Sequence, residues 1–175
     1  MQLKNEPLNK LSLDFMKQLT HNVKEAEARV NCRALILTST CRVFSAGLDL
    51  EQMVFSQLIK NDAPCNINEM QVKPNKEVLR EYWGAYQDLC FTLYGTRLAT
   101  IASLDGHTLG AGCALALCCD SRILLKSARI GLNEAEYGFG VPSWTVDLFK
   151  GAIGSHHAER ACSLGIVFEA GSHAT

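Results

Sequence analysis

The spacing of apolar and polar residues along this chain predicts both helices and strands. Apolar positions recur every three to four residues over 12–29 and 77–94, which predicts two amphipathic helices. Two more helices are predicted near the end of the chain, one opened by Pro142 and one capped by Ser155. Short apolar runs predict strands, the first two of them buried, at residues 34–38, 98–102, 122–125 and 128–132. Because strands and helices alternate, the pattern predicts an α/β domain.

Residues 54–76 interrupt this alternation. They are polar, contain Pro64 and Pro74, and show no sustained period. A loop of this length is uncommon inside a compact domain unless it is functional or mobile. The sequence therefore predicts a long loop here, with at most one short helix.

Two stretches of small residues each lead from a strand into a helix. Residues 99–120 combine an apolar strand, a glycine-rich turn and an apolar helix, and residues 43–50 form a second elbow of the same kind. A helix N-terminus carries backbone N–H groups without intrahelical partners, and it stabilises negative charge. Such an elbow can hold an anionic group, or it can serve only to pack a strand closely against a helix.

Composition and charge exclude several functional classes. The chain of 175 residues is 47% hydrophobic and has a formal net charge of -1, so we expect one folded domain without general attraction for nucleic acid or anionic membranes. Its eight cysteines show neither a CxxC pair nor zinc-type spacing with histidine, and we expect them to be reduced in an intracellular protein. His156 and His157 are adjacent and would not face one metal. We therefore expect no metal site. No run reaches transmembrane length, and no targeting segment is visible.

Three ordered segments resemble the crotonase (enoyl-CoA hydratase/isomerase) superfamily, and within it the branch of mitochondrial Δ3,Δ2-enoyl-CoA isomerases. They are FSAGLDL at 44–50, SLDGHTLGAGCALALCCDSRIL at 103–124 and IGLNEAEYGFGVPSW at 130–144. The resemblance implies a spiral of ββα units that binds an acyl-CoA thioester between the two elbows, usually in a homotrimer. It covers residues 1–164 as a crotonase-like core with incomplete first strands, and it leaves 165–175 as a divergent tail.

The resemblance also implies a site. It assigns the N–H groups of Ala46 and Ala111 as donors to the thioester oxygen. It assigns Glu134 as the proton carrier. The segment expected to hold the coenzyme A part of the substrate consists of Ala46, Gly47, Leu48, Asp49 and Leu50, and Asp49 is also a candidate helix cap. Relatives have a glycine where this chain has Ala111. No cofactor is expected, because coenzyme A belongs to the substrate.

Moving a double bond from the 3- to the 2-position needs a proton removed from C2 and one returned at C4. Two backbone N–H groups can stabilise the enolate oxygen, and losing one such donor typically costs ~10²–10³ in rate. A carboxylate near apolar surface has a raised pKa and can act first as base and then as acid. For Glu134 the alternative is an ordinary loop glutamate in a surface ion pair. Glu136 is a weaker candidate for the same role.

Position 114 separates the activities of the superfamily. Hydratases carry a second glutamate there, which positions and activates water, whereas this chain has Ala114. Together with Ala114, the resemblance therefore implies an isomerase of fatty-acid β-oxidation, in the mitochondrial matrix or the peroxisome. Two alternatives remain open. One is a non-catalytic acyl-CoA-binding or interaction protein on the same scaffold, and the other is another acyl-CoA enzyme such as a hydratase or thioesterase.

The ends of the chain also carry an expectation. Relatives continue past Leu164 into helices that cover the acyl pocket, so we expect this chain to be a truncated form that lacks the C-terminal helical region. Apolar faces on the helices after Pro142 would then be open. Exposed apolar patches favour association, so we expect marginal stability, a doubtful trimer and weak catalysis.

Overall fold

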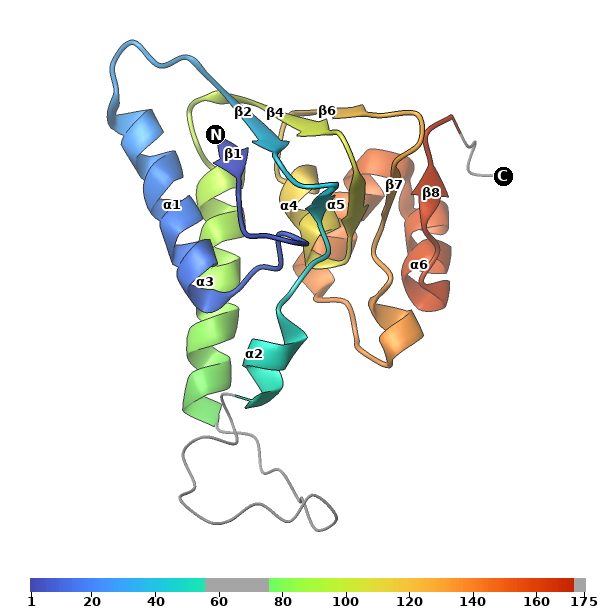
Figure 1. Cartoon of the computed structure of the whole chain (residues 1–175). Helices are drawn as coiled ribbons and strands as arrows, with labels where there is room; N and C mark the ends of the chain where they lie inside the picture. The colour runs from blue at the N-terminus through green and yellow to red at the C-terminus, as the bar shows by residue number, and fades with distance from the viewer. Residues whose placement is uncertain (56–75, 172–175) are drawn as a thin grey trace, which may run out of the picture.

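The computed structural model describes residues 1–55 and 76–171 (Figure 1). Its helical elements are α1 (Leu13–Ala28), α2 (Leu50–Phe55), α3 (Lys76–Tyr94), α4 (Ala111–Leu117), the 3₁₀ helix η2 (Glu134–Tyr137), α5 (Ser143–Ile153) and α6 (Ser155–Leu164). Its strands are β1 (Gln2–Leu3), β2 (Ala34–Ser39), β3 (Val43–Ser45), β4 (Ala99–Leu104), β5 (His107–Leu109), β6 (Ser121–Leu124), β7 (Arg129–Gly131) and β8 (Phe168–Glu169). The predicted α/β class is confirmed. The ends of the loop predicted at 54–76 belong to α2 and α3, and its residues 56–75 lie outside the described part.

The strands form two sheets, and successive segments of the chain add strands to both. One has the order β1-β2-β4-β6, and the other has the order β3-β5-β7-β8. Each repeating unit gives its first strand to one sheet and its second strand to the other, and a helix follows. Successive units therefore pair in parallel, as in Ile36 beside Ile101 and Val43 beside His107. This is the repeating ββα arrangement that the resemblance implied.

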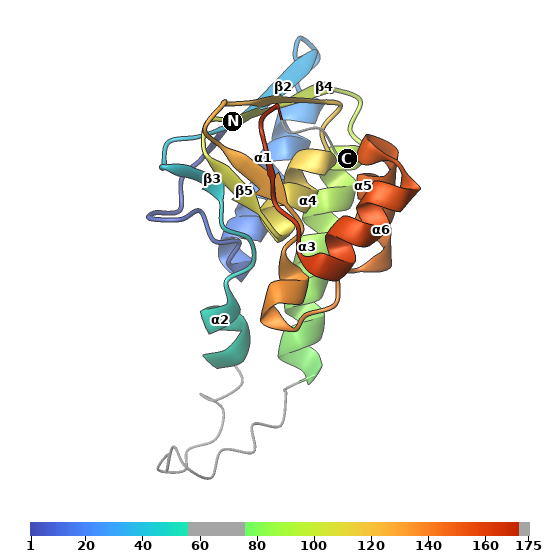
Figure 2. The same ribbon diagram turned by 90° about the vertical axis from the view of Figure 1, so that its right-hand side faces the viewer.

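The core lies between the sheets and the helices, and α4 is at its centre. All seven residues of α4 are buried, which agrees with the prediction of an apolar helix in this stretch. Helix α3 packs against α1 and α4, and its largest fully buried side chains are Tyr82 and Tyr86. Helices α5 and α6 pack together beside β7 and β8 (Figure 2). None of the helices within 1–55 and 76–171 is long and apolar enough to cross a membrane.

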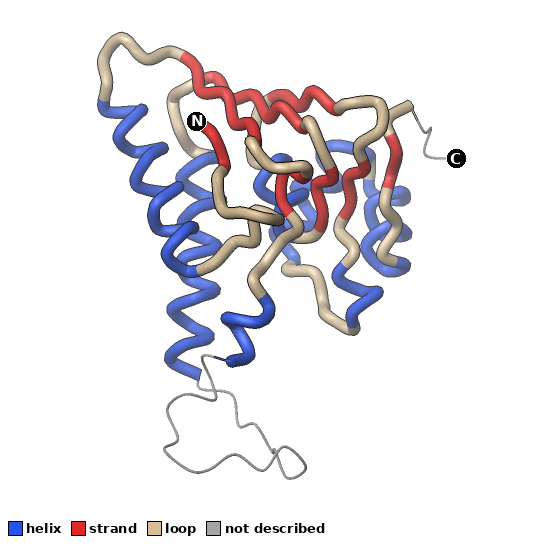
Figure 3. Tube along the Cα trace, viewed as in Figure 1, coloured by secondary structure: helices blue, strands red, loops and turns tan. Residues whose placement is uncertain are grey.

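Two predicted strands are buried on one face only. In β2, Leu35 and Leu37 are buried, whereas Ile36 between them is 53% exposed. In β4, Thr100 and Ala102 point inward and Ala99 is exposed. The physical reason is visible in Figure 3, where the helices lie on one side of this sheet and leave the other side uncovered. The prediction of fully buried strands was therefore wrong for the outer face.

Two predicted helix caps are replaced by other groups. Ser12 precedes α1, but its side chain makes no capping bond, and the Leu13 N–H donates instead to Gln52 Oε1 at 2.8 Å. Ser155 lies inside α6, and Gly154 with φ +83° occupies the cap position. The stretch predicted as a divergent tail contains β8, which pairs antiparallel with β7.

Candidate active site

The two elbows meet because glycines remove side chains from their contact. Gly47 has φ +96°, and a Cβ atom there would lie 3.1 Å from Leu109 O and 3.3 Å from Ala111 N. A Cβ on Gly112 would lie 2.7 Å from Ser45 Cβ. Because both positions are glycines and carry no Cβ, the end of β3 can lie directly against the start of α4. Two segments that are far apart in the sequence therefore form one wall.

Beside this wall lies a cavity of about 420 Å³. It is lined by the predicted residues Ala46, Gly47, Leu48, Leu50, Ala111 and Glu134. Met53, Trp83, Tyr86 and Pro142 add apolar surface. The structure thus brings together all predicted site residues except Asp49. The Asp49 side chain caps α2 instead, since Oδ1 accepts from the Gln52 N–H at 3.2 Å, as the alternative for this residue predicted.

Glu134 is half-buried at the cavity and forms no ion pair with a described residue. It is the first residue of η2, and its carboxylate lies against Gly110, where a Cβ would be 3.3 Å from Glu134 Oε1. Oε2 is buried and has no hydrogen-bond partner among the described residues. Burial raises the pKa of this carboxyl above its ordinary value, as predicted. Glu136, by contrast, is exposed and lines a different cavity.

The backbone donors differ from the prediction in one position. The Ala46 N–H donates to Leu8 O at 3.0 Å, so it is already engaged, and its assignment as an oxyanion donor is corrected. Leu48 forms a parallel bridge with Leu11 through the neighbouring Gly47 C=O and Asp49 N–H. In a parallel bridge the central residue points its own N–H to the opposite side. Within the described part of the chain, the N–H groups of Leu48 and Ala111 have no partner, and both residues line the cavity.

The described residues that line the cavity include one cation and two carboxylates, and only one of these carboxylates has an ion-pair partner. Lys10 is the one cation among the described lining residues, and its Nζ lies 3.2 Å from Glu51 Oε2 and 4.0 Å from Asp49 Oδ1. The lining carboxylates are Glu51, which pairs with Lys10, and Glu134. Glu134 is therefore the lining carboxylate without a cation partner in the described structure. Position 114 contributes no third carboxylate, because Ala114 is fully buried and does not reach the cavity.

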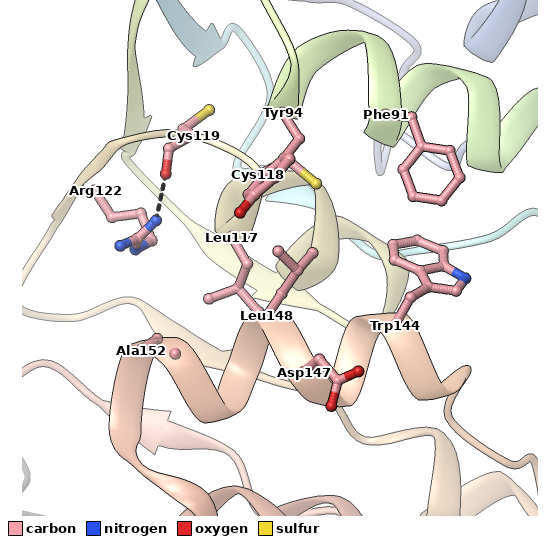
Figure 4. Close-up of a pocket in the computed structure, with 11 residues that line it drawn as sticks. Phe91, Tyr94, Leu117, Cys118, Cys119, Arg122, Trp144, Asp147, Leu148 and Ala152 are labelled. Carbon is pink, nitrogen blue, oxygen red and sulfur yellow. Dashed lines mark hydrogen bonds between the residues drawn. The ribbon is translucent and has the colours of Figure 1, made fainter.

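A second cavity of about 440 Å³ lies between α3, α4 and α5 (Figure 4). Phe91 and Trp144 face one another there, and Arg122 Nη1 donates to Cys119 O at 2.6 Å. Burial raises the pKa of the Cys119 thiol to about 12, so this thiol stays protonated at neutral pH. None of the predicted site residues lines this cavity. The cavity at the elbows is therefore the better candidate for chemistry.

The described cysteines and histidines are not grouped as metal ligands. The seven cysteines within the described ranges are unpaired. The rings of His156 and His157 contact one another with centroids 5.6 Å apart. Among residues 1–55 and 76–171, no group of three histidine, cysteine or acidic side chains is arranged to hold a metal ion.

Known proteins with the same sequence pattern share this fold. The profile of the family described as Enoyl-CoA hydratase/isomerase matches residues 1–66 and 65–173. The chain is 37% identical to human (Homo sapiens) enoyl-CoA delta isomerase 1, mitochondrial, over 96% of this chain and 51% of that protein. The corresponding protein of Mus musculus is 35% identical over 96% of this chain and 53% of its own length.

The comparison of structures agrees. The crystal structure of human mitochondrial delta3-delta2-enoyl-CoA isomerase superposes with a TM-score of 0.83 and 36% sequence identity. The match covers 97% of this chain and 60% of that one. The chain thus spans about half the length of the curated relatives that it matches.

Proposed function

Since the chain belongs to the enoyl-CoA hydratase/isomerase family, we propose that it converts 3-enoyl-CoA thioesters into 2-trans-enoyl-CoA. The curated relatives described above are named mitochondrial enoyl-CoA delta isomerases. We extend both properties to this chain as part of the proposal, within fatty-acid β-oxidation. We expect a homotrimer for full-length members, and sedimentation would establish the state of this chain.

The observation that carries the proposal is the carboxylate of half-buried Glu134, whose Oε2 atom is buried and has no hydrogen-bond partner in the described structure. In the proposed reaction the thioester oxygen accepts hydrogen bonds from the Leu48 and Ala111 N–H groups. These donors stabilise the enolate that forms when Glu134 removes a proton from C2. The protonated Glu134 then returns that proton to C4, so that the double bond moves and the carboxylate is regenerated. Lys10, the one cation of the described lining, pairs with Glu51 and would have to exchange this partner to contact the polyanionic coenzyme A part.

Water addition is less well supported by the same site. A hydratase needs a second group to hold and polarise water, and Ala114 supplies none. Because Ala114 is fully buried, a carboxylate introduced there would also have to be buried, at a cost in folding free energy. We therefore favour isomerisation over hydration.

The test uses the purified 175-residue chain with 3-enoyl-CoA and, separately, with 2-enoyl-CoA. We expect the chain to convert 3-enoyl-CoA into the conjugated 2-trans thioester, and we expect no hydration of 2-enoyl-CoA. Absorbance and chromatography measure both products. Binding of acyl-CoA without turnover would support a non-catalytic acyl-CoA-binding protein instead. Hydration as fast as isomerisation would show that the interpretation of position 114 is wrong.

A further inference from the structure

Tyr82 connects α3 to the first elbow through its hydroxyl group. The side chain is only 2% exposed. Its oxygen accepts a hydrogen bond from the Asp49 N–H at 2.9 Å and donates one to Leu11 O at 2.5 Å. Tyr82 does not itself line the cavity, whereas the next residue, Trp83, does. The hydroxyl therefore contacts the backbone that carries the cavity wall rather than the cavity.

The hydroxyl lies where one of the two backbone hydrogen bonds between Leu11 and the elbow at 43–50 is long. Leu11 and Leu48 form an isolated parallel bridge, which needs two backbone hydrogen bonds. One of them, from Leu11 N to Gly47 O, is 2.8 Å long. The other, from Asp49 N to Leu11 O, is 3.5 Å long, which is beyond the usual range for such a bond. The Tyr82 hydroxyl bonds both of these distant groups and so completes the bridge.

This bridge determines the direction of the Leu48 N–H. The Gly47 C=O and the Leu48 N–H belong to one planar peptide unit, so they point in opposite directions. With the C=O held by the Leu11 N–H, the N–H faces the cavity. The following peptide unit is held by Tyr82 through the Asp49 N–H. The conformation of Leu48 is thus fixed on both sides.

We propose that Tyr82 is a positioning residue for the oxyanion site, acting through the backbone of Leu48. This inference rests on the proposed function for the use of the Leu48 N–H, but the contact with the elbow is independent of it. An electrostatic donor must be placed in advance at the position where charge develops. A displacement of about 1 Å in a catalytic group can cost roughly 10²-fold in rate. Without the hydroxyl, the backbone on the two sides of Leu48 would keep the hydrogen bond at Gly47 O but lose the one that Tyr82 makes with the Asp49 N–H.

The experiment compares Tyr82→Phe with Tyr94→Phe. Both substitutions remove a hydroxyl from the same helix, but Tyr94 is 65% exposed and does not line the cavity at the elbows. For Tyr82→Phe we expect kcat to fall by roughly tenfold to 100-fold, with KM within about threefold of the parent. The acid limb of the pH profile should not move, because Glu134 is untouched. Tyr94→Phe should match the parent in all of these.

Hydrogen exchange of the backbone amides provides a measurement that needs no turnover. We expect the Asp49 amide to exchange faster in Tyr82→Phe, while the α4 amides keep the parent's rates. If the parent chain does not isomerise 3-enoyl-CoA, the proposed function fails, and faster exchange at Asp49 would still support the anchoring contact. Unchanged kcat together with unchanged exchange would overturn the inference. So would a lower melting temperature with kcat per folded molecule equal to the parent's, since that result indicates a purely structural role.

Discussion

At the scale of single residues, Glu134 is one of two described residues with a buried side-chain oxygen that has no hydrogen-bond partner, and it is the ionisable one of the two. A buried polar atom without a hydrogen bond costs folding free energy. The structure retains this cost at Glu134 Oε2, and no described side chain relieves it. The cavity that holds this oxygen is also lined by Leu48 and Ala111, whose N–H groups are unpaired in the described structure, and the proposed proton transfer uses all three groups.

We expect Glu134→Gln to lower isomerase turnover by ~10²–10⁴, because the amide keeps the shape but cannot carry the proton. Acyl-CoA affinity, measured by titration calorimetry, should stay within a few-fold of the parent. Glu136→Gln is the matched control, since Glu136 lies in the same 3₁₀ helix but is exposed outside the cavity. Equal turnover in the two variants would contradict the assignment of Glu134.

The raised pKa of Glu134 has consequences for both activity and stability. The base must be ionised, so kcat/KM should fall at acid pH with an apparent pKa above the ordinary value of 4.5 for glutamate. The folded state binds this proton more tightly than the unfolded state does. The stability contributed by protonated Glu134 is therefore present below the ordinary pKa and is lost as pH rises through the raised one.

Glu134→Gln should accordingly raise the melting temperature at pH 7, because it removes an unpaired buried charge, and this gain should shrink towards pH 4. Thermal melts of parent and variant across this pH range test the sign. A variant that is less stable than the parent at pH 7 would show that an unseen partner stabilises the carboxylate.

At the scale of elements, the site depends on how closely β3 approaches α4. Gly112 makes this approach possible, since a Cβ there would lie 2.7 Å from Ser45 Cβ and 2.8 Å from Ser45 O. The backbone oxygen cannot move away as a flexible side chain would. Any added atom must therefore separate the two elbows.

We expect Gly112→Ala to destabilise the protein by about 1–3 kcal/mol through overpacking and to lower kcat, because Leu48 and Ala111 move apart. Gly84→Ala is the matched control within α3, where a Cβ would meet no atom within 4 Å. Alanine is the better helix former, so Gly84→Ala should be neutral or more stable by up to ~1 kcal/mol. Urea unfolding and turnover assays on both variants measure these effects, and two equally stable variants would disprove the close-packing argument.

At the scale of the whole molecule, the sheet β1-β2-β4-β6 has one face that the described helices leave uncovered (Figure 3). Ile36, Ile123 and Leu125 are 53%, 64% and 50% exposed, and the first two lie on strands of this sheet. The helices cover the opposite face (Figure 1). Removing apolar area from water yields about 25 cal/mol per Å², which favours contacts between molecules through this face.

We expect the chain to associate with rising concentration and the double variant Ile36→Thr/Ile123→Thr to associate less, as measured by sedimentation velocity. Val30→Thr is the control, because Val30 is 85% exposed but lies outside the sheet. If the double variant and the control associate to the same extent as the parent, another surface is responsible.

The longer elements could be predicted from the sequence because their apolar period repeats over several turns. The helix predicted at 77–94 is α3 at Lys76–Tyr94, and the apolar helix after the glycine turn is α4. The short strands β3, β5 and β8 were not predicted. Strands of two or three residues carry too little pattern to be recognised, and they are stable only because a neighbour pairs with them.

The sequence by itself determined the order of the two elbows and Glu134, because glycines, small residues and a carboxylate are local features that do not depend on distant partners. Only the tertiary structure decided which N–H groups face the cavity. The Ala46 N–H donates to Leu8 O, whereas the bridge between Leu48 and Leu11 leaves the Leu48 N–H facing the cavity. The physical reason is that every backbone donor has the same chemistry in the sequence. A backbone N–H is available to a ligand only when no other segment of the folded chain supplies an acceptor for it.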